Sequence, residues 1–229
     1  MFRESLMSDA GGDFSQEASS HYDQTYFKWQ RAIGEFGGWA NLTKFAKYCE
    51  PSFSVLDFGC GGGYLLAKLE CREKVGIEVN PAARSQATAV GIRVYASAAE
   101  VPDEWADLII SNHALEHCLH PLKELRELVL KLKPRARIVI VVPCESVLRR
   151  YRPNDVNHHL YSWSPMNLAN LLEEAGYVVE ESKAFIHKWP PGHRLIRSIG
   201  GRYLFEVACR AYGVLSPAWS QVRAVAHRP

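Results

Sequence analysis

The chain has 229 residues, of which 47% are hydrophobic and 23% charged, and its formal net charge at pH 7 is +2. These values are typical of a globular protein with a full core. The nearly balanced charge argues against nucleic acid as the main partner. No apolar run reaches the roughly 18 residues that a membrane span needs, and the first residues lack the pattern of a secretory signal. The six cysteines are scattered without a C-x-x-C pair, which indicates reduced thiols in a cytoplasmic protein.

The composition predicts one folded domain preceded by a short arm. Residues 1–17 are rich in Ser, Gly, Asp and Glu, so we expect them to be disordered. We assign the remaining residues to a single domain with three parts. These are an N-terminal cap over 18–50, a cofactor-binding core over 51–142, and substrate-side loops, lid and final strands over 143–229.

The cap contains many aromatic side chains at helical spacing. One interpretation is a helix that covers the sheet. The other is a flap over an active site, in which Tyr22 or Tyr26 contacts substrate. Both interpretations can hold, because a flap also needs apolar anchors.

The stretch SVLDFGCGGGY at residues 54–64 organises the chain. It predicts a buried strand followed by a sharp glycine turn. The leucines that follow, Leu65, Leu66 and Leu69, have helical spacing and predict a helix. A turn at a helix N-terminus would present free backbone N–H groups to a polar ligand.

Two kinds of nucleotide cofactor fit a glycine turn of this type. The dinucleotide pattern G-x-G-x-x-G is incomplete, because Tyr64 stands where the third glycine belongs. Asp57, just before the turn, would repel a pyrophosphate but attract an ammonium group. Glu78 ends the next predicted strand about 20 residues beyond the turn, where a carboxylate accepts ribose hydroxyls. S-adenosylmethionine has both an amino-acid end and a nucleoside end, and it fits both acids.

The rest of the pattern alternates strands and helices and predicts a parallel, doubly wound α/β sheet. A polar, irregular stretch follows the fifth strand, where such sheets bind ligands. A helical segment, 192–215, is inserted before the last strand; its arginines form either a solvated face or a lid that recognises an anionic group. The predicted strands are 54–58, 74–78, 92–95, 106–111, 137–142, 177–186 and 221–227, and the predicted helices outside the insertion include 82–90, 121–133 and one from Pro165.

Histidines and a glutamate follow the fourth strand, and more histidines lie in the irregular stretch. We expect His113 or His158 to act as general base, with Glu116 as a further catalytic candidate. A second group is expected to contact substrate: His117, His159 and Tyr161.

A metal site is the alternative to this acid–base arrangement. The spacing H-x-x-E-H at residues 113–117 matches a zinc-peptidase motif, but it follows a strand end and not the long helix which that motif needs. A divalent ion shared by His113, Asp155 and His158 would polarise an acceptor diol. We expect no metal.

The motifs around Asp57, Glu78 and Leu115-Glu116-His117 resemble those of class I S-adenosylmethionine-dependent methyltransferases, over roughly residues 50–229. Pro121 after the last motif is similar to the small-molecule branch, and residues 159–165 are similar to members associated with sugar or polysaccharide modification. The resemblance implies a Rossmann-like, seven-stranded, mostly parallel sheet, with an antiparallel last strand between the fifth and sixth.

The resemblance also implies roles for single residues around the cofactor. Asp57 and the turn at Gly59, Cys60 and Gly61 would hold the methionine end, and Glu78 the ribose. Val79, Ala98 and Ala99 would border the adenine, and Asn112 would lie near the methyl-bearing sulfur.

The expected function is O-methylation of a small-molecule or sugar hydroxyl, by in-line methyl transfer with a histidine general base. Alternatives are N-methylation of an amino sugar or other small amine, methylation of protein or nucleic acid, and a non-catalytic cofactor-binding module. We expect a monomer or homodimer, with no nucleic-acid partner.

Overall fold

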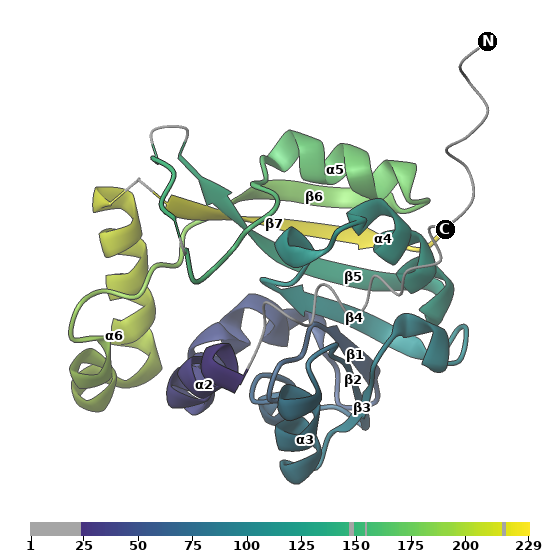
Figure 1. Cartoon of the computed structure of the whole chain (residues 1–229), viewed down its shortest axis with the longest axis horizontal. Coiled ribbons are helices and arrows are strands. Elements are labelled where there is room, and N and C mark those ends of the chain that lie inside the picture. The colour runs from purple at the N-terminus through teal and green to yellow at the C-terminus, as the bar shows by residue number, and fades with distance from the viewer. Residues whose placement is uncertain (1–23, 147–148, 154, 217–218) are drawn as a thin grey trace.

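A single seven-stranded sheet forms the centre of the chain, with strand order β3-β2-β1-β4-β5-β7-β6 (Figure 1). The computed structural model describes residues 24–146, 149–153, 155–216 and 219–229, with side chains from residue 34 on, Trp219 excepted. Strands β1 to β5 pair in parallel, and β7 pairs antiparallel with both β5 and β6. The strands are β1 Ser54–Phe58, β2 Glu73–Ile77, β3 Arg93–Tyr95, β4 Ala106–Asn112, β5 Leu132–Glu145, β6 Val178–Phe185 and β7 Trp219–His227. The predicted fold class is confirmed, including the antiparallel strand inserted between the fifth and sixth.

Helices cover both faces of this sheet. They are α2 Gln24–Phe45, α3 Pro81–Ala89, α4 Pro121–Lys131, α5 Pro165–Glu174 and α6 His193–Leu215, with short 3-10 turns η1 Ala46–Tyr48, η2 Leu66–Lys68, η3 Ala98–Glu100 and η4 Leu115–His117. Local sequence explains several helix starts. The Ser164 hydroxyl accepts a hydrogen bond from the Asn167 N–H at the start of α5, and the Asn80 side chain caps α3 in the same way.

Alternating strand residues point into two separate cores. Leu56 packs on the α4 and α5 side together with Leu128, whereas Val55 packs on the opposite side together with Phe45 of α2. All four side chains are fully buried. The central strands are therefore apolar on both faces, as expected for a covered parallel sheet.

The helix predicted directly after the glycine turn is wrong. The chain there forms turns and the single 3-10 turn η2, which ends at Leu69 in an extended conformation. Leu65, Leu66 and Leu69 are all buried, so their spacing reflects burial and not an α-helix. The glycine turn occupies much of the segment that follows β1, because Gly59, Gly61 and Gly63 all have positive φ, which a regular helix does not allow.

The inserted segment forms α6, which stands away from the sheet beside α2 (Figure 1). The two helices share a small core of Phe36, Ala40, Phe205 and Cys209. The guanidinium groups of two α6 residues, Arg197 and Arg202, lie 4.2 and 4.3 Å from the centre of the Trp39 ring on α2. Cation–π contacts thus hold these arginines against α2.

The arm predicted for residues 1–17 lies outside the described residues, and the three-part division of residues 18–229 stays a prediction. Over residues 24–146, 149–153, 155–216 and 219–229, no helix is long and apolar enough to cross a membrane.

The core on the α4 face gives a first test. Replacing the buried Leu128 by Ala should lower the free energy of unfolding by about 2–5 kcal/mol, because it removes apolar contacts and leaves a cavity. Leu130→Ala on the same helix is the matched control, since that side chain is 48% exposed, and its effect should stay within about 0.5 kcal/mol. Urea unfolding measures both. Equal effects would contradict the assigned face of α4.

Candidate functional site

One cavity of about 1050 Å³ opens at the carboxyl ends of β1, β2 and β4. Its walls come from the glycine turn, the end of β2, the turn after β4 and one side of α2. Open parallel sheets bind ligands at this edge. The volume is at the upper end of small-molecule sites, so the cavity has room for a cofactor and an acceptor together.

The glycine turn shapes one wall by close approach of backbone. The N–H groups of Gly59 and Cys60 donate to the Ile77 carbonyl at 2.9 and 3.0 Å, and the Gly61 N–H donates to Glu78 Oε2 at 2.9 Å. These three donors are therefore used within the protein, contrary to the expected free N–H groups. A Cβ on Gly59 would lie 2.3 Å from the Cβ of Ala114, so only glycine fits there.

Two carboxyl groups face this wall, the buried Asp57 and the partly buried Glu78. Burial raises the pKa of Asp57 to about 8, and the neighbouring Glu78 adds to that rise. Burial also raises the pKa of Glu78, against hydrogen bonds from the N–H groups of Asn80 and Gly61. Two acids in one cavity suit a ligand that carries an ammonium group and hydroxyl donors. This is the donor set of S-adenosylmethionine at its methionine and ribose ends.

Most other residues expected at the cofactor also line the cavity. They are Cys60, Val79, Ala99 and Asn112. Ala98 is the exception, because it is 1% exposed and packs in the core behind this wall.

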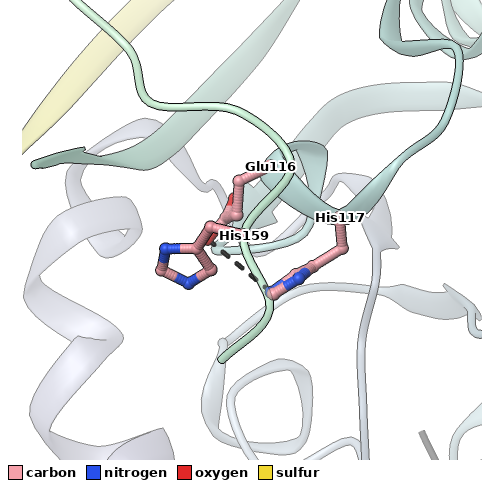
Figure 2. A group of neighbouring side chains, drawn as sticks. All are labelled: Glu116, His117 and His159. Carbon is pink, nitrogen blue, oxygen red and sulfur yellow. Dashed lines mark ion pairs between the residues drawn. The ribbon is translucent and has the colours of Figure 1, made fainter. Parts of the chain in front are cut away.

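Histidines surround a buried carboxylate at the other end of the cavity, which we call the acceptor end (Figure 2). Glu116 is fully buried, and its Oε1 lies 3.1 Å from His113 Nδ1 and 3.9 Å from His117 Nε2. Burial would raise the pKa of Glu116, but its hydrogen bond and attraction to His113 outweigh this and hold the pKa below its ordinary value. Glu116 is therefore a carboxylate that holds two imidazoles in place.

The acceptor end also includes His159, from the irregular stretch after β5. Backbone hydrogen bonds bring this stretch to η4: the N–H groups of Leu160 and Tyr161 donate to the Glu116 carbonyl at 3.0 and 3.3 Å. The rings of His117 and His159 meet with centroids 5.1 Å apart. Two segments that are distant in sequence thus build one end of the site.

Some predicted residues lie elsewhere. Among the described residues, His158 and Tyr161 do not line the cavity, and the Tyr161 hydroxyl donates to the Leu119 carbonyl. Tyr22 lies outside the described residues, and the side chain of Tyr26 on α2 is not described.

The sequence prediction missed Lys44, His187 and Gln221, which also line the cavity. Lys44 is 2% exposed, and its Nζ donates to Asn112 Oδ1 at 2.9 Å and to Gln221 Oε1 at 2.7 Å. Burial lowers its pKa to about 7, against the attraction of Glu116. The sequence signal for Lys44 was the presence of a lysine among the apolar residues of a predicted helix.

One group at the acceptor end has the composition of a metal site. Glu116, His117 and His159 each offer one ligand atom, and these atoms lie within 4.8 Å of one another (Figure 2). This set differs from the one considered from the sequence, which was His113, Asp155 and His158. The Asp155 carboxylate instead lies near Arg149, with Oδ1 3.6 Å from Nη2.

The sequence profile of a family described as "Methyltransferase domain" matches residues 28–182. The chain belongs to the class I S-adenosylmethionine-dependent methyltransferases. It is therefore a methyltransferase, and its cofactor is S-adenosylmethionine. No curated protein sequence matches the chain.

Solved structures place this methyltransferase among proteins with a shared fold and low sequence identity. A Haemonchus contortus phosphoethanolamine N-methyltransferase 2 is 13% identical with a TM-score of 0.68, over 93% of this chain and 60% of that longer one. A Thermotoga maritima methyltransferase, described as a possible histamine N-methyltransferase, is 17% identical with a TM-score of 0.63, over 90% and 98%. The [4+2]-cyclase SpnF is 16% identical with a TM-score of 0.58, over 88% and 83%.

Cofactor binding by this methyltransferase should release a proton from Asp57. The pKa of about 8 keeps this acid mostly protonated at pH 7, and an ammonium group placed beside it favours the carboxylate. Binding of S-adenosylmethionine at pH 7 should thus release about one proton, and affinity should rise with pH until about pH 8. Calorimetry in buffers of different ionisation enthalpy measures the release, and Asp57→Asn should abolish it. The same buffer dependence in both proteins would contradict the role of Asp57.

Proposed function

We propose that this methyltransferase methylates a hydroxyl group of a small-molecule or sugar acceptor, with His113 as general base. The observation that carries the proposal is the contact of 3.1 Å between His113 Nδ1 and Glu116 Oε1, in the same cavity as Asp57 and Glu78. A carboxylate on one ring nitrogen favours the tautomer with its lone pair on Nε2, and it stabilises the charge that the ring acquires with a proton.

The other histidines are weaker candidates for this role. Burial lowers the pKa of His117 to about 4, although Glu116 opposes the shift, so its ring is a poor proton acceptor. His158 is outside the described lining of the cavity. His159 directs its Nδ1 to a different carboxylate, that of the partly exposed Glu145, at 3.2 Å. His113 combines a place in the wall with a hydrogen bond to the fully buried Glu116.

The backbone conformation of His113 supports its proposed role as general base. Its φ is +57°, in the left-handed region that side chains other than glycine rarely adopt. The His113 N–H donates to the Val141 carbonyl on β5 at 2.8 Å, which anchors this conformation to the sheet. Strained backbone that its surroundings hold in place is common at catalytic residues.

When bound, S-adenosylmethionine supplies an electrophilic methyl group on a sulfonium centre. The protein's part is to orient the acceptor and take its proton. Asp57 and Glu78 would hold the cofactor, and Lys44 would fix Asn112 near its reactive end. His113 would remove the hydroxyl proton, a contribution of about 10²–10⁴-fold in rate.

An amine acceptor is the second candidate. The Haemonchus contortus structure is described as an N-methyltransferase and the Thermotoga maritima structure as a possible one. An amine needs only to lose its proton before transfer, so a general base matters less there. The net charge of +2 disfavours a nucleic-acid acceptor, and membership of a methyltransferase family disfavours a non-catalytic cofactor-binding module.

The test is to assay the formation of S-adenosylhomocysteine with panels of sugar alcohols, phenols, amino sugars and small amines. We expect turnover of a hydroxyl acceptor, and His113→Ala should lower its kcat by about 10²–10⁴-fold without changing cofactor affinity. His227→Ala is the matched control and should keep wild-type kcat. His227 is the last residue of β7 and pairs with Glu180 of β6, at a partly exposed position. Turnover confined to amines, or full kcat in His113→Ala, would contradict the proposal.

A further inference from the structure

The acceptor end contains a carboxylate oxygen that the acid–base pair leaves unused. Glu116 is fully buried, and its Oε2 has no hydrogen-bond partner among the described residues. An unsatisfied buried carboxylate oxygen is costly, so it calls for a ligand. Oε1 already contacts His113.

We propose that Glu116, His117 and His159 bind a divalent transition-metal ion at the acceptor end of the cavity. Two imidazoles and one carboxylate are a ligand set for ions such as Zn²⁺, Fe²⁺ or Mn²⁺. Three protein ligands leave further coordination positions open, as in catalytic sites. All three residues line the cavity, so the open positions face the space where an acceptor would bind.

The distances are compatible with a shared ion. The three ligand atoms lie within 4.8 Å of one another, whereas ligands about 2.1 Å from one ion are about 3–4 Å apart. Side-chain adjustments of about 1 Å would close the site. Figure 2 shows that the imidazoles of His117 and His159 belong to two different segments and lie beside the Glu116 side chain.

The outer contacts of the two histidines resemble those of metal ligands. His159 Nδ1 lies 3.2 Å from Glu145 Oε1, which favours the tautomer with its lone pair on Nε2. The His117 ring is hydrogen-bonded to the backbone of His158. Metal-binding histidines almost always use their second nitrogen in this way.

The ion would serve the acceptor. A divalent ion polarises a bound hydroxyl and lowers its pKa, and His113 stands beside the same carboxylate to receive the proton. This use of the ion rests on the proposed function. The ion site rests only on the protein's own ligands, so it can be tested without cofactor or acceptor.

The experiment is a titration of chelator-treated, metal-free protein with Co²⁺ and, separately, Zn²⁺, with no S-adenosylmethionine present. We expect one ion per chain and visible Co²⁺ absorption without a thiolate charge-transfer band, because the ligands are nitrogen and oxygen. His117→Ala and His159→Ala should each weaken binding by more than about 100-fold, and Glu145→Gln by about 10–100-fold. His227→Ala should bind as the wild type does.

Thermal unfolding gives an independent readout that also reports folding of each variant. Added Zn²⁺ should raise the unfolding temperature of the wild type and of His227→Ala, but not that of His159→Ala. Absence of stoichiometric binding, a thiolate band, or unchanged affinity in His117→Ala and His159→Ala would overturn the site. Because no methyl acceptor takes part, such a failure would leave the proposed methylation untouched.

Discussion

The hydrogen bonds of the Glu78 carboxylate are the interaction on which the shape of the glycine-turn wall of the cavity depends. Its two oxygens accept from the N–H groups of Gly61 and Asn80, each at 2.9 Å. They thereby tie the glycine turn after β1 to the start of α3 after β2. The cost of burying this acid is visible in its raised pKa, which the two bonds oppose. The bond from the Gly61 N–H helps to fix this glycine at its left-handed φ of +53°.

The position of the glycine turn then decides where α2 lies. A Cβ on Gly34 would meet the Tyr64 ring at 2.2 Å, and one on Gly38 would meet the Tyr64 carbonyl at 2.3 Å. Helix α2 can therefore rest directly on the turn and place Lys44 in the cavity. The tyrosine that breaks the dinucleotide pattern is thus the residue against which α2 packs. Tyr64 thus both breaks the dinucleotide pattern and lines the cavity beside α2.

Sequence alone was sufficient where the information is local. The apolar strands and the acids at the ends of β1 and β2 follow from neighbouring residues, and the predicted fold class was confirmed. Prediction from sequence failed where tertiary contacts decide. Leu65 to Leu69 have helical spacing, yet the glycine turn leaves only a 3-10 turn. Lys44 and Asn112 are 68 residues apart along the chain, and His159 reaches Glu116 through backbone bonds of Leu160 and Tyr161, which no side-chain pattern encodes.

We propose that Asp57, Glu78 and the glycine turn form the S-adenosylmethionine site. The most direct measurement is calorimetric titration of wild type, Glu78→Ala and Glu73→Ala with S-adenosylmethionine, after checking that all three unfold cooperatively. Glu73 is the matched control, since it begins the same strand with an exposed side chain. Wild type and Glu73→Ala should bind with equal affinity, whereas Glu78→Ala should lose measurable binding. Retained affinity in Glu78→Ala would contradict this proposal.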